Sequence, residues 1–206
     1  MPAQQKRPRQ GIAAIFALLG GLILAVAGWM WLSPGMSQRV TGQAGIGGPF
    51  ELVNGDGKPV TERAWQGKYL LVYFGYTFCP DVCPTTLNEV AGAMEQLGPK
   101  TDRVQPLFIT VDPKRDTPAV VKQYAAAFSP RLVGLTGTME QVSKAARAYR
   151  VFFTLHAPKD AARPDEYTVD HSSIIYLMGP DGRFVAPIRA DLAADAMAKD
   201  IARHLP

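Results

Sequence analysis

The sequence predicts an α/β protein in which a mixed β-sheet is flanked by helices on both faces. Two continuous apolar runs, 69–74 and 107–111, are typical of strands buried on both sides. Helix-period stretches follow each of them, and the chain then forms an apolar hairpin at 174–178 and 184–188. A last amphipathic helix is expected at about 192–204. Strands that alternate with helices and end in a hairpin indicate a mixed sheet with a helical layer on each face.

The remaining elements follow from apolar spacing and from turn residues. We expect a short N-terminal hairpin at 50–53 and 58–60, helices over 84–97, 118–128 and 138–149, and a short strand at 132–135. Thr138 and Gln141 have the spacing of a capping box at the start of the third of these helices. Residues 154–169 are polar and lack a period, so they are expected to be an irregular excursion that ends in a short β-like run at 167–170.

The basic excess of the chain lies at its N-terminus. Lys and Arg total 22 against 18 Asp and Glu, but Lys6, Arg7 and Arg9 stand in residues 1–10 and no acid occurs before Glu51. Without those three residues the balance is 22 − 3 = 19 against 18. A nucleic-acid binding surface needs a basic stripe on the folded domain, so we predict no nucleic-acid partner.

Residues 11–32 contain no charge and would form a helix of roughly 33 Å, long enough to span a bilayer. We therefore predict a basic cytoplasmic leader at 1–10, a transmembrane anchor at 11–32, a Gly/Ser-rich flexible linker at 33–48 and an exported domain at 49–206. A cleaved signal peptide ending near residues 25–27 is the alternative. The apolar run continues to residue 32, which favours a retained anchor.

The short basic leader lacks a long Ser/Arg-rich presequence, a feature that favours a bacterial over a mitochondrial location. The predicted location is accordingly the inner membrane, as a single-pass protein with its N-terminus in the cytoplasm and its soluble domain in the periplasm.

The two cysteines of the chain, Cys79 and Cys83, lie between the strand at 69–74 and the helix at 84–97. A helix start favours thiolate over thiol and lowers a cysteine pKa from about 8.5. With three residues between them, the sulfurs can close a disulfide or bind one ion. A purely structural disulfide is the alternative, but a bridge across so few residues stabilises a fold only weakly.

Two thiolates suit Cu(I) or Zn(II) and leave either ion short of a ligand. Of the three histidines, His204 is expected to be a solvated residue at a helix end, and His156 a surface residue in the excursion. His171 precedes the apolar strand at 174–178 and is held by the core. From spacing alone it is as readily a structural histidine as a ligand.

If His171 is a ligand, its ring needs a partner that fixes the tautomer. Asp170, or the hydroxyls of Ser172 and Ser173, are the candidates that stand beside it in the sequence.

Three segments together resemble one known family. They are GYTFCPDVCP at 75–84, VDPKRDTP at 111–118 and DHSS at 170–173, and they occur in this order. The chain resembles, from about residue 48 to the C-terminus, the Sco/SenC family of copper-binding proteins needed to assemble cytochrome c oxidase. A CxxxC segment alone would be a weak signal, whereas the three segments together are specific.

The resemblance implies a thioredoxin-like fold with an added N-terminal β-hairpin, and copper, as Cu(I), Cu(II) or both, held by Cys79, Cys83 and His171. It also implies a metallochaperone that delivers copper to the dinuclear centre of oxidase subunit II, with other copper chaperones and a thioredoxin-like reductant as partners. Asp112 and Asp81 belong to the same segments. Each could shape the site or contact a partner, or simply be a carboxylate in a strand-end turn and at a helix start.

A different class of function remains open. Cys79 and Cys83 would serve equally as the redox pair of a thiol–disulfide oxidoreductase that keeps the oxidase cysteines reduced, and His171 would then tune a cysteine pKa. Apart from such thiol–disulfide reductase activity, we do not expect a classical enzyme. A peroxidase is compatible with a thioredoxin-like frame but fits these segments less well.

Overall fold

A computed structural model of the 206-residue chain describes residues 20–21, 45–158, 160 and 162–206. The chain divides into two units, Met1–Gln43 and Ala44–Pro206. The predicted leader lies outside the described residues, as do the anchor apart from Gly20 and Gly21 and the linker up to residue 44. Among the described residues, no helix has the length and apolar character needed to cross a membrane.

In the described part of the second unit, seven strands form one mixed sheet in the order β2-β1-β5-β4-β3-β8-β9. The three central strands β3, β4 and β5 are parallel, and the outer pairs β1–β2, β1–β5, β3–β8 and β8–β9 are antiparallel. The strands are β1 (Glu51–Asn54), β2 (Pro59–Thr61), β3 (Tyr69–Gly75), β4 (Val104–Thr110), β5 (Val133–Thr136), β8 (Ile174–Met178) and β9 (Phe184–Arg189). The predicted mixed sheet and both hairpins are confirmed.

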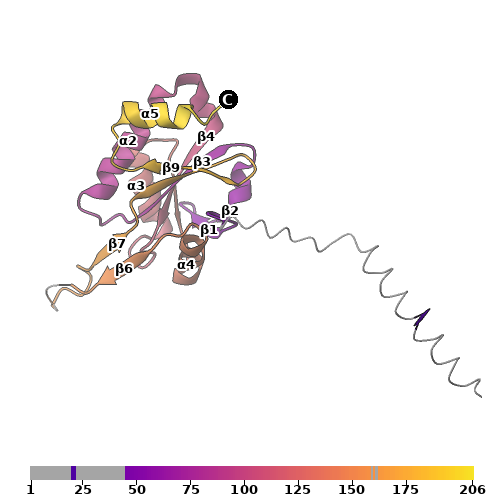
Figure 1. Cartoon of the computed structure of the whole chain (residues 1–206). Coiled ribbons are helices and arrows are strands. Elements are labelled where there is room, and N and C mark those ends of the chain that lie inside the picture. The colour runs from indigo at the N-terminus through magenta and orange to yellow at the C-terminus, as the bar shows by residue number, and fades with distance from the viewer. Residues whose placement is uncertain (1–19, 22–44, 159, 161) are drawn as a thin grey trace, which may run out of the picture. The chain divides into compact units, whose positions relative to one another are not determined.

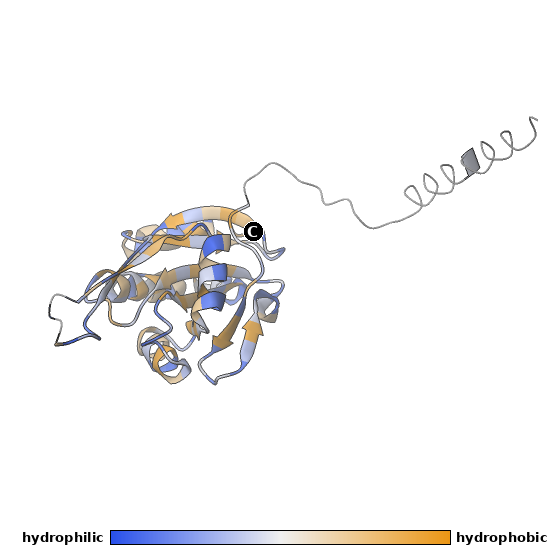
Figure 2. Cartoon of the chain, turned by 90° about the horizontal axis from the view of Figure 1, so that it is seen from below, coloured by the Kyte–Doolittle hydropathy of each residue, from blue (hydrophilic) through white to orange (hydrophobic). Residues whose placement is uncertain are grey.

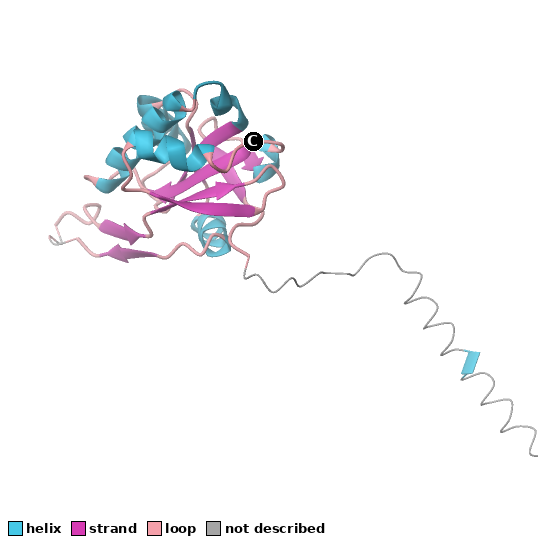
Figure 3. Ribbon diagram, turned by 45° about the horizontal axis from the view of Figure 1, so that its top comes forward, coloured by secondary structure: helices cyan, strands magenta, loops and turns pink. Residues whose placement is uncertain are grey.

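Helices cover both faces of this sheet (Figure 1, Figure 3). They are α2 (Val82–Gln96), α3 (Pro118–Phe128), α4 (Met139–Ala148) and α5 (Ala194–Ala202), with short 3-10 turns η1 (Glu62–Trp65) and η2 (Gly98–Arg103). Neighbouring side chains of β3 point to opposite faces. Tyr73 reaches Cys83 in α2, whereas the ring of Phe74 packs 5.4 Å from that of Tyr149 at the end of α4.

The central strands are buried as their composition predicts. Residues 70–75 of β3 and 106–110 of β4 are all buried, and Figure 2 shows hydrophobic residues along the strands of the sheet. Layers of helix on both sides explain why these strands read as continuous apolar runs rather than as an alternating pattern.

Two predicted boundaries are wrong in ways that matter for the site. Helix α2 begins at Val82 rather than at 84, since the N–H of Thr85 already bonds to the carbonyl of Asp81 at 3.1 Å. Cys83 therefore lies inside the first helical turn instead of before it. Strand β4 begins at Val104 rather than at 107, because its first residues pair with the start of β3.

A separate two-stranded sheet stands beside the central one. It consists of β6 (Phe153–His156) and β7 (Thr168–His171), which pair with each other, and Figure 1 shows it extending away from the central sheet. We call residues 153–171 the arm. The prediction of an irregular excursion over 154–169 is wrong at both ends, where the chain is extended and paired, whereas the expected β-like run at 167–170 is confirmed with a shift of one residue.

Helix α4 begins with the predicted capping box, and this motif allows a test of stability. The hydroxyl of Thr138 accepts the N–H of Gln141 at 3.2 Å, and the Gln141 side chain accepts the N–H of Thr138 at 2.8 Å. Replacing Thr138 with Ala should lower the free energy of unfolding by about 1 kcal/mol, measured by urea denaturation.

A matched control is available at the start of α3. Thr117 occupies the same cap position there, but its side chain makes no cap hydrogen bond. Thr117→Ala should therefore cost clearly less than Thr138→Ala, and equal losses in the two variants would contradict the assignment of the capping box.

Candidate metal centre

The two cysteines are placed at the carboxyl end of β3 by a close approach of helix to strand. Cys83 is fully buried in the first turn of α2, and its N–H donates to Sγ of Cys79 at 3.4 Å. A Cβ atom at Gly75, the last residue of β3, would lie 2.9 Å from Sγ of Cys83. Only glycine leaves space for the sulfur at that position, so Gly75 is part of the site's construction.

His171 closes the site from the end of β7. Its Nε2 lies 3.2 Å from Sγ of Cys83, and the ligand atoms of Cys79, Cys83 and His171 all lie within 4.8 Å of one another. Cys79 and His171 are partly exposed, whereas Cys83 is not. The structure thus brings together the three residues that the sequence singled out, although His171 stands 88 positions after Cys83.

The ring of His171 is held in a ligating tautomer. Nδ1 lies 3.2 Å from the carbonyl oxygen of Ser172, which can only accept a hydrogen bond. A proton is accordingly assigned to Nδ1, so that in the neutral ring the lone pair is on Nε2, which faces the sulfurs. The rings of Tyr73 and Tyr76 contact the imidazole edge-on, with centroids 6.1 and 6.0 Å away.

The prediction that a neighbouring carboxylate or hydroxyl would orient the His171 ring is wrong. The Asp170 carboxylate contacts Nε2 of His156 at 2.8 Å instead, and the Ser172 hydroxyl bonds to the backbone of Phe152. Asp170 alternates to the outer side of the β7 strand, where it is largely exposed, so a backbone carbonyl takes the expected role.

The other two histidines do not contribute to the site. His156 is half-exposed on the arm, and His204 lies just beyond α5. Within the described residues, Cys79, Cys83 and His171 form the only group of three or more His, Cys, Asp or Glu side chains that could hold a metal ion.

The two thiols, both free, have opposite protonation preferences. A hydrogen bond from the Cys83 side chain, together with the N–H groups of Cys83 and Asp81 and the nearby His171, lowers the pKa of Cys79 to about 5. The same hydrogen bond to Cys79, reinforced by burial, raises the pKa of Cys83. At neutral pH the pair therefore carries one thiolate, on the more exposed cysteine, and one proton.

Tyr73 is a residue of the site that the sequence did not indicate. Its ring is buried beneath the site, and its hydroxyl donates to Sγ of Cys83 at 3.8 Å. In the sequence it is one more aromatic residue of a buried strand. Its contact with Cys83 becomes evident only in the structure, because residues 73 and 75 lie on the face of β3 against which α2 begins.

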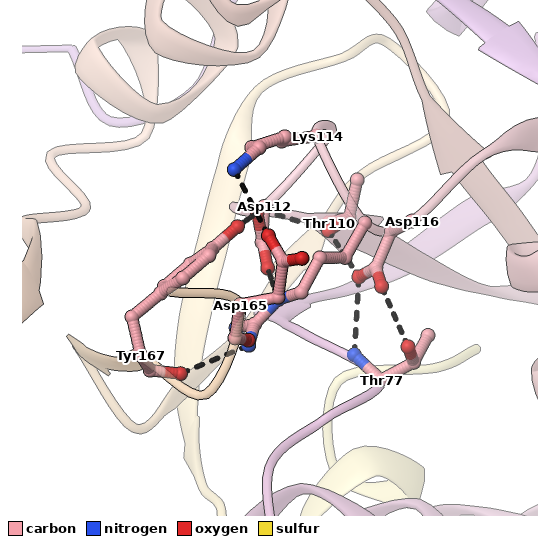
Figure 4. Close-up of polar contacts among 8 residues, drawn as sticks. Thr77, Thr110, Asp112, Lys114, Asp116, Asp165 and Tyr167 are labelled. Carbon is pink, nitrogen blue, oxygen red and sulfur yellow. Dashed lines mark hydrogen bonds and ion pairs between the residues drawn. The ribbon is translucent and has the colours of Figure 1, made fainter. Parts of the chain in front are cut away.

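A polar network fastens the segments that carry the ligands (Figure 4). The buried carboxylate of Asp116 accepts hydrogen bonds from the N–H and hydroxyl of Thr77 at 3.0 and 2.6 Å, and from the hydroxyl of Thr110 at 2.5 Å. Burial raises the pKa of Asp116, and these hydrogen bonds oppose that rise. Asp116 thereby ties the loop before Cys79 to the end of β4.

Two further acidic residues of the family segments, Asp112 and Asp81, differ in placement. Asp112 is fully buried and accepts hydrogen bonds from the Tyr167 hydroxyl at 2.6 Å and from Nε of Arg115 at 2.5 Å. Its carboxylate therefore has no exposed surface through which to contact a partner. Of the roles expected for Asp112, the structure fits that of a carboxylate in the turn after β4, where it bonds to residues that surround the site. Asp81 is exposed just before α2, as expected for a helix-start carboxylate.

Taken together, the fold and the site define a class: a thioredoxin-like protein with two thiols and one imidazole converging beside a strand-to-helix junction. Soft thiolates with an imidazole suit Cu(I) or Zn(II), and three ligands leave such an ion with an open position. The same pair of thiols can also form a disulfide.

Comparison with known proteins identifies the family. Residues 38–206 match the SCO1/SenC family. The human protein named SCO1 homolog, mitochondrial, is 42% identical over 170 residues, which cover 82% of this chain and 56% of the human protein. The chain therefore belongs to the SCO1/SenC family, while spanning about half the length of several relatives that it matches.

Solved structures agree with this assignment. The structure of Bradyrhizobium japonicum ScoI with copper bound is 44% identical, with a TM-score of 0.70, and the match covers 78% of this chain and 99% of that one. Yeast Sco1 with copper bound is 40% identical, with a TM-score of 0.70, and the match covers 78% of this chain and 88% of that one. The thioredoxin-like fold predicted from the resemblance is confirmed.

The unequal cysteine pKa values can be tested by alkylation of the reduced protein. The rate of alkylation at Cys79, followed by peptide mass mapping, should rise with pH through a midpoint near pH 5 and then level off, because the thiolate is the reactive form. Cys83 should stay largely unmodified over the same range.

The variant Cys83→Ala removes the hydrogen bond that contributes most to the low pKa of Cys79. Its alkylation midpoint should therefore move upward, toward the usual cysteine value. A midpoint unchanged by this substitution would show that the thiolate is stabilised by another group.

Proposed function

We propose that the protein is a copper metallochaperone that binds copper through Cys79, Cys83 and His171 and delivers it during assembly of cytochrome c oxidase. The observation that carries the proposal is the convergence of the three ligand atoms within 4.8 Å of one another, with a thiolate on Cys79 and a proton-free Nε2 on His171. These are the protonation states that a metal ligand requires.

The predicted copper cofactor is supported by two independent findings. Relatives of 44% and 40% identity have structures with copper bound, and the described residues of this chain hold a Cys-Cys-His cluster. The donor set alone would also accept zinc, so the relatives are what favours copper.

The exposure of the site supports a role in transfer. Cys79 and His171 can be reached from solvent, which an acceptor needs in order to replace ligands one at a time. Two exposed apolar side chains, Phe78 and Val82, stand beside the cysteines with 60% and 47% of their surface accessible. Exposed apolar residues around a polar centre are typical of a surface that meets another protein.

The acceptor in this proposal is the dinuclear copper site of oxidase subunit II, with other copper chaperones as donors and a thioredoxin-like reductant that keeps both thiols open. Oxidation of Cys79 and Cys83 to a disulfide would remove both thiolate ligands, so the redox state of the pair would control copper binding.

The same proposal assigns roles to the N-terminal residues. The leader at 1–10, the anchor at 11–32 and the linker at 33–48 would tether the copper-binding domain, 49–206, to the periplasmic side of an inner membrane, where an oxidase of that membrane could be reached. This part of the assignment stays a prediction from sequence.

Copper titration of the reduced protein tests the ligand set. The wild-type protein should bind one copper ion, and Cys79→Ala and His171→Ala should each lose far more than the roughly 10- to 100-fold in affinity that follows removal of a residue orienting a ligand. His156→Ala is the matched control, since it removes an exposed imidazole outside the cluster. Unchanged affinity in both ligand variants would refute the metal site.

One observation favours the thiol–disulfide oxidoreductase as a second candidate. Cys79 is an accessible thiolate with a buried, protonated Cys83 beside it, which is the arrangement of an attacking and a resolving cysteine. In that reaction the Cys79 thiolate attacks a disulfide of the target, Cys83 then displaces the target's sulfur, and the chain's pair is oxidised as the target is reduced.

Cells that lack the gene distinguish the two functions through His171→Ala. This variant keeps both thiols but loses one ligand, so it should fail to restore oxidase activity if copper delivery is the function. Added copper should then rescue the deletion, whereas added reductant alone should not. Full activity of His171→Ala, with rescue by reductant, would instead assign the thiol reaction.

A further inference from the structure

Arg115 joins the turn after β4 to the arm that carries His171. Its side chain is 8% exposed and donates from Nε to the Asp112 carboxylate at 2.5 Å. Its Nη1 donates to the carbonyl oxygens of Asp165 and Tyr167, both at 2.9 Å. A planar guanidinium can hold several acceptors at once in a fixed geometry, which a lysine ammonium cannot do.

The same guanidinium also contacts the segment that carries Cys79. Its central carbon lies 3.6 Å from the ring centroid of Tyr167 in the arm, and 4.6 Å from that of Phe78, the residue before Cys79. Tyr76, at 5.8 Å, belongs to the same segment and packs edge-on against the His171 ring. Arg115 thus contacts both the segment that carries the cysteine ligands and the arm that carries the histidine ligand.

Asp112 completes the connection. Its fully buried carboxylate accepts the Tyr167 hydroxyl at 2.6 Å as well as Nε of Arg115, and Figure 4 shows Asp112 and Tyr167 facing one another across the turn. Burial raises the pKa of Tyr167 to about 12, so the hydroxyl keeps the proton that it donates. A buried ion pair of this kind need not add net stability, because removing both charges from water offsets much of their attraction.

The arm needs such a connection. In the described residues, β6 and β7 pair with each other and not with a strand of the central sheet, so no sheet hydrogen bond fixes the arm against the cysteines. The backbone of His171 continues into β8, which begins three residues later, and is preceded by β7, whose entry lies next to Tyr167.

We propose that Arg115 is a positioning residue for this centre: bonded to Asp112 and Tyr167, it holds the arm against the Cys79 segment and so keeps His171 within coordinating distance of the two sulfurs. The inference deepens the proposed copper function and rests on it for its metal readout. It also makes a statement about the metal-free protein, which can be tested separately.

The metal-free test uses amide hydrogen exchange of the whole chain. Arg115→Met keeps an apolar stem of similar length but removes every donor, so the amides of β6 and β7 should exchange faster, while those of β3 and β4 keep their rates. Unchanged exchange in the arm would overturn the proposal whether or not the protein binds copper.

The metal test is a double-mutant cycle in copper affinity. Arg115→Met should weaken copper binding about 10- to 100-fold, as removal of a residue that orients a ligand does. In the background of His171→Ala the same substitution should have no further effect, because the ligand through which it acts is gone. Equal losses in both backgrounds would overturn the proposal, and failure of the wild-type protein to bind copper would overturn the copper function alone.

Three further variants separate geometry from charge and from loss of folding. Arg115→Lys keeps the charge but not the bridging donors, so it should behave like Arg115→Met; wild-type affinity in this variant would overturn the proposal. Tyr167→Phe removes only the hydroxyl bonded to Asp112 and should weaken copper binding by a smaller factor, with the thermal midpoint near wild type. Arg131→Met, which removes a half-exposed arginine paired with Asp102, should leave copper affinity unchanged.

Discussion

The close approach of Cys83 to the end of β3 is the constraint on which the rest of the site depends. The sulfur occupies space that a side chain at residue 75 would fill, and the Tyr73 hydroxyl reaches it from the same face of the strand. Because Cys83 is fixed against the sheet, Cys79, four residues earlier in the loop before α2, lies further out and half-exposed, and His171 has a defined sulfur to face. The hydrogen bond between the two sulfurs, together with burial and the N–H groups at the helix start, then divides one proton unequally between the two thiols.

This arrangement explains why metal binding and thiol chemistry are difficult to separate in such a centre. Both need an accessible thiolate, and Cys79 provides it. The imidazole also serves both, because its Nδ1 is bonded to the carbonyl of Ser172 and its Nε2 faces the sulfurs. A ring that takes a proton from Cys83 would present the same nitrogen to the sulfur, so the copper-bound structures of relatives are what favours the metal reading.

Much of the fold could be predicted from the sequence, because its central strands are buried on both faces and its helices carry a clear apolar period. Of the arm only β7 could be predicted, as a β-like run, whereas β6 could not, since it is mostly exposed and neither alternation nor hydrophobicity marks it. The cysteine pair was evident from its position, but the proximity of His171 came from a family resemblance and not from spacing. Arg115 and Tyr167 belong to a polar network whose partners are some 50 residues apart, and no local pattern reveals such contacts.

The single proton on Cys83 has a consequence for how a metal ion would enter this centre. Before loading, the two sulfurs together carry one negative charge, on Cys79, and one proton, on Cys83. An ion that binds both sulfurs displaces this proton, because the thiolate and not the thiol is the ligand. Loading would therefore release a proton from a fully buried sulfur, whereas the half-exposed sulfur can meet the incoming ion without losing one.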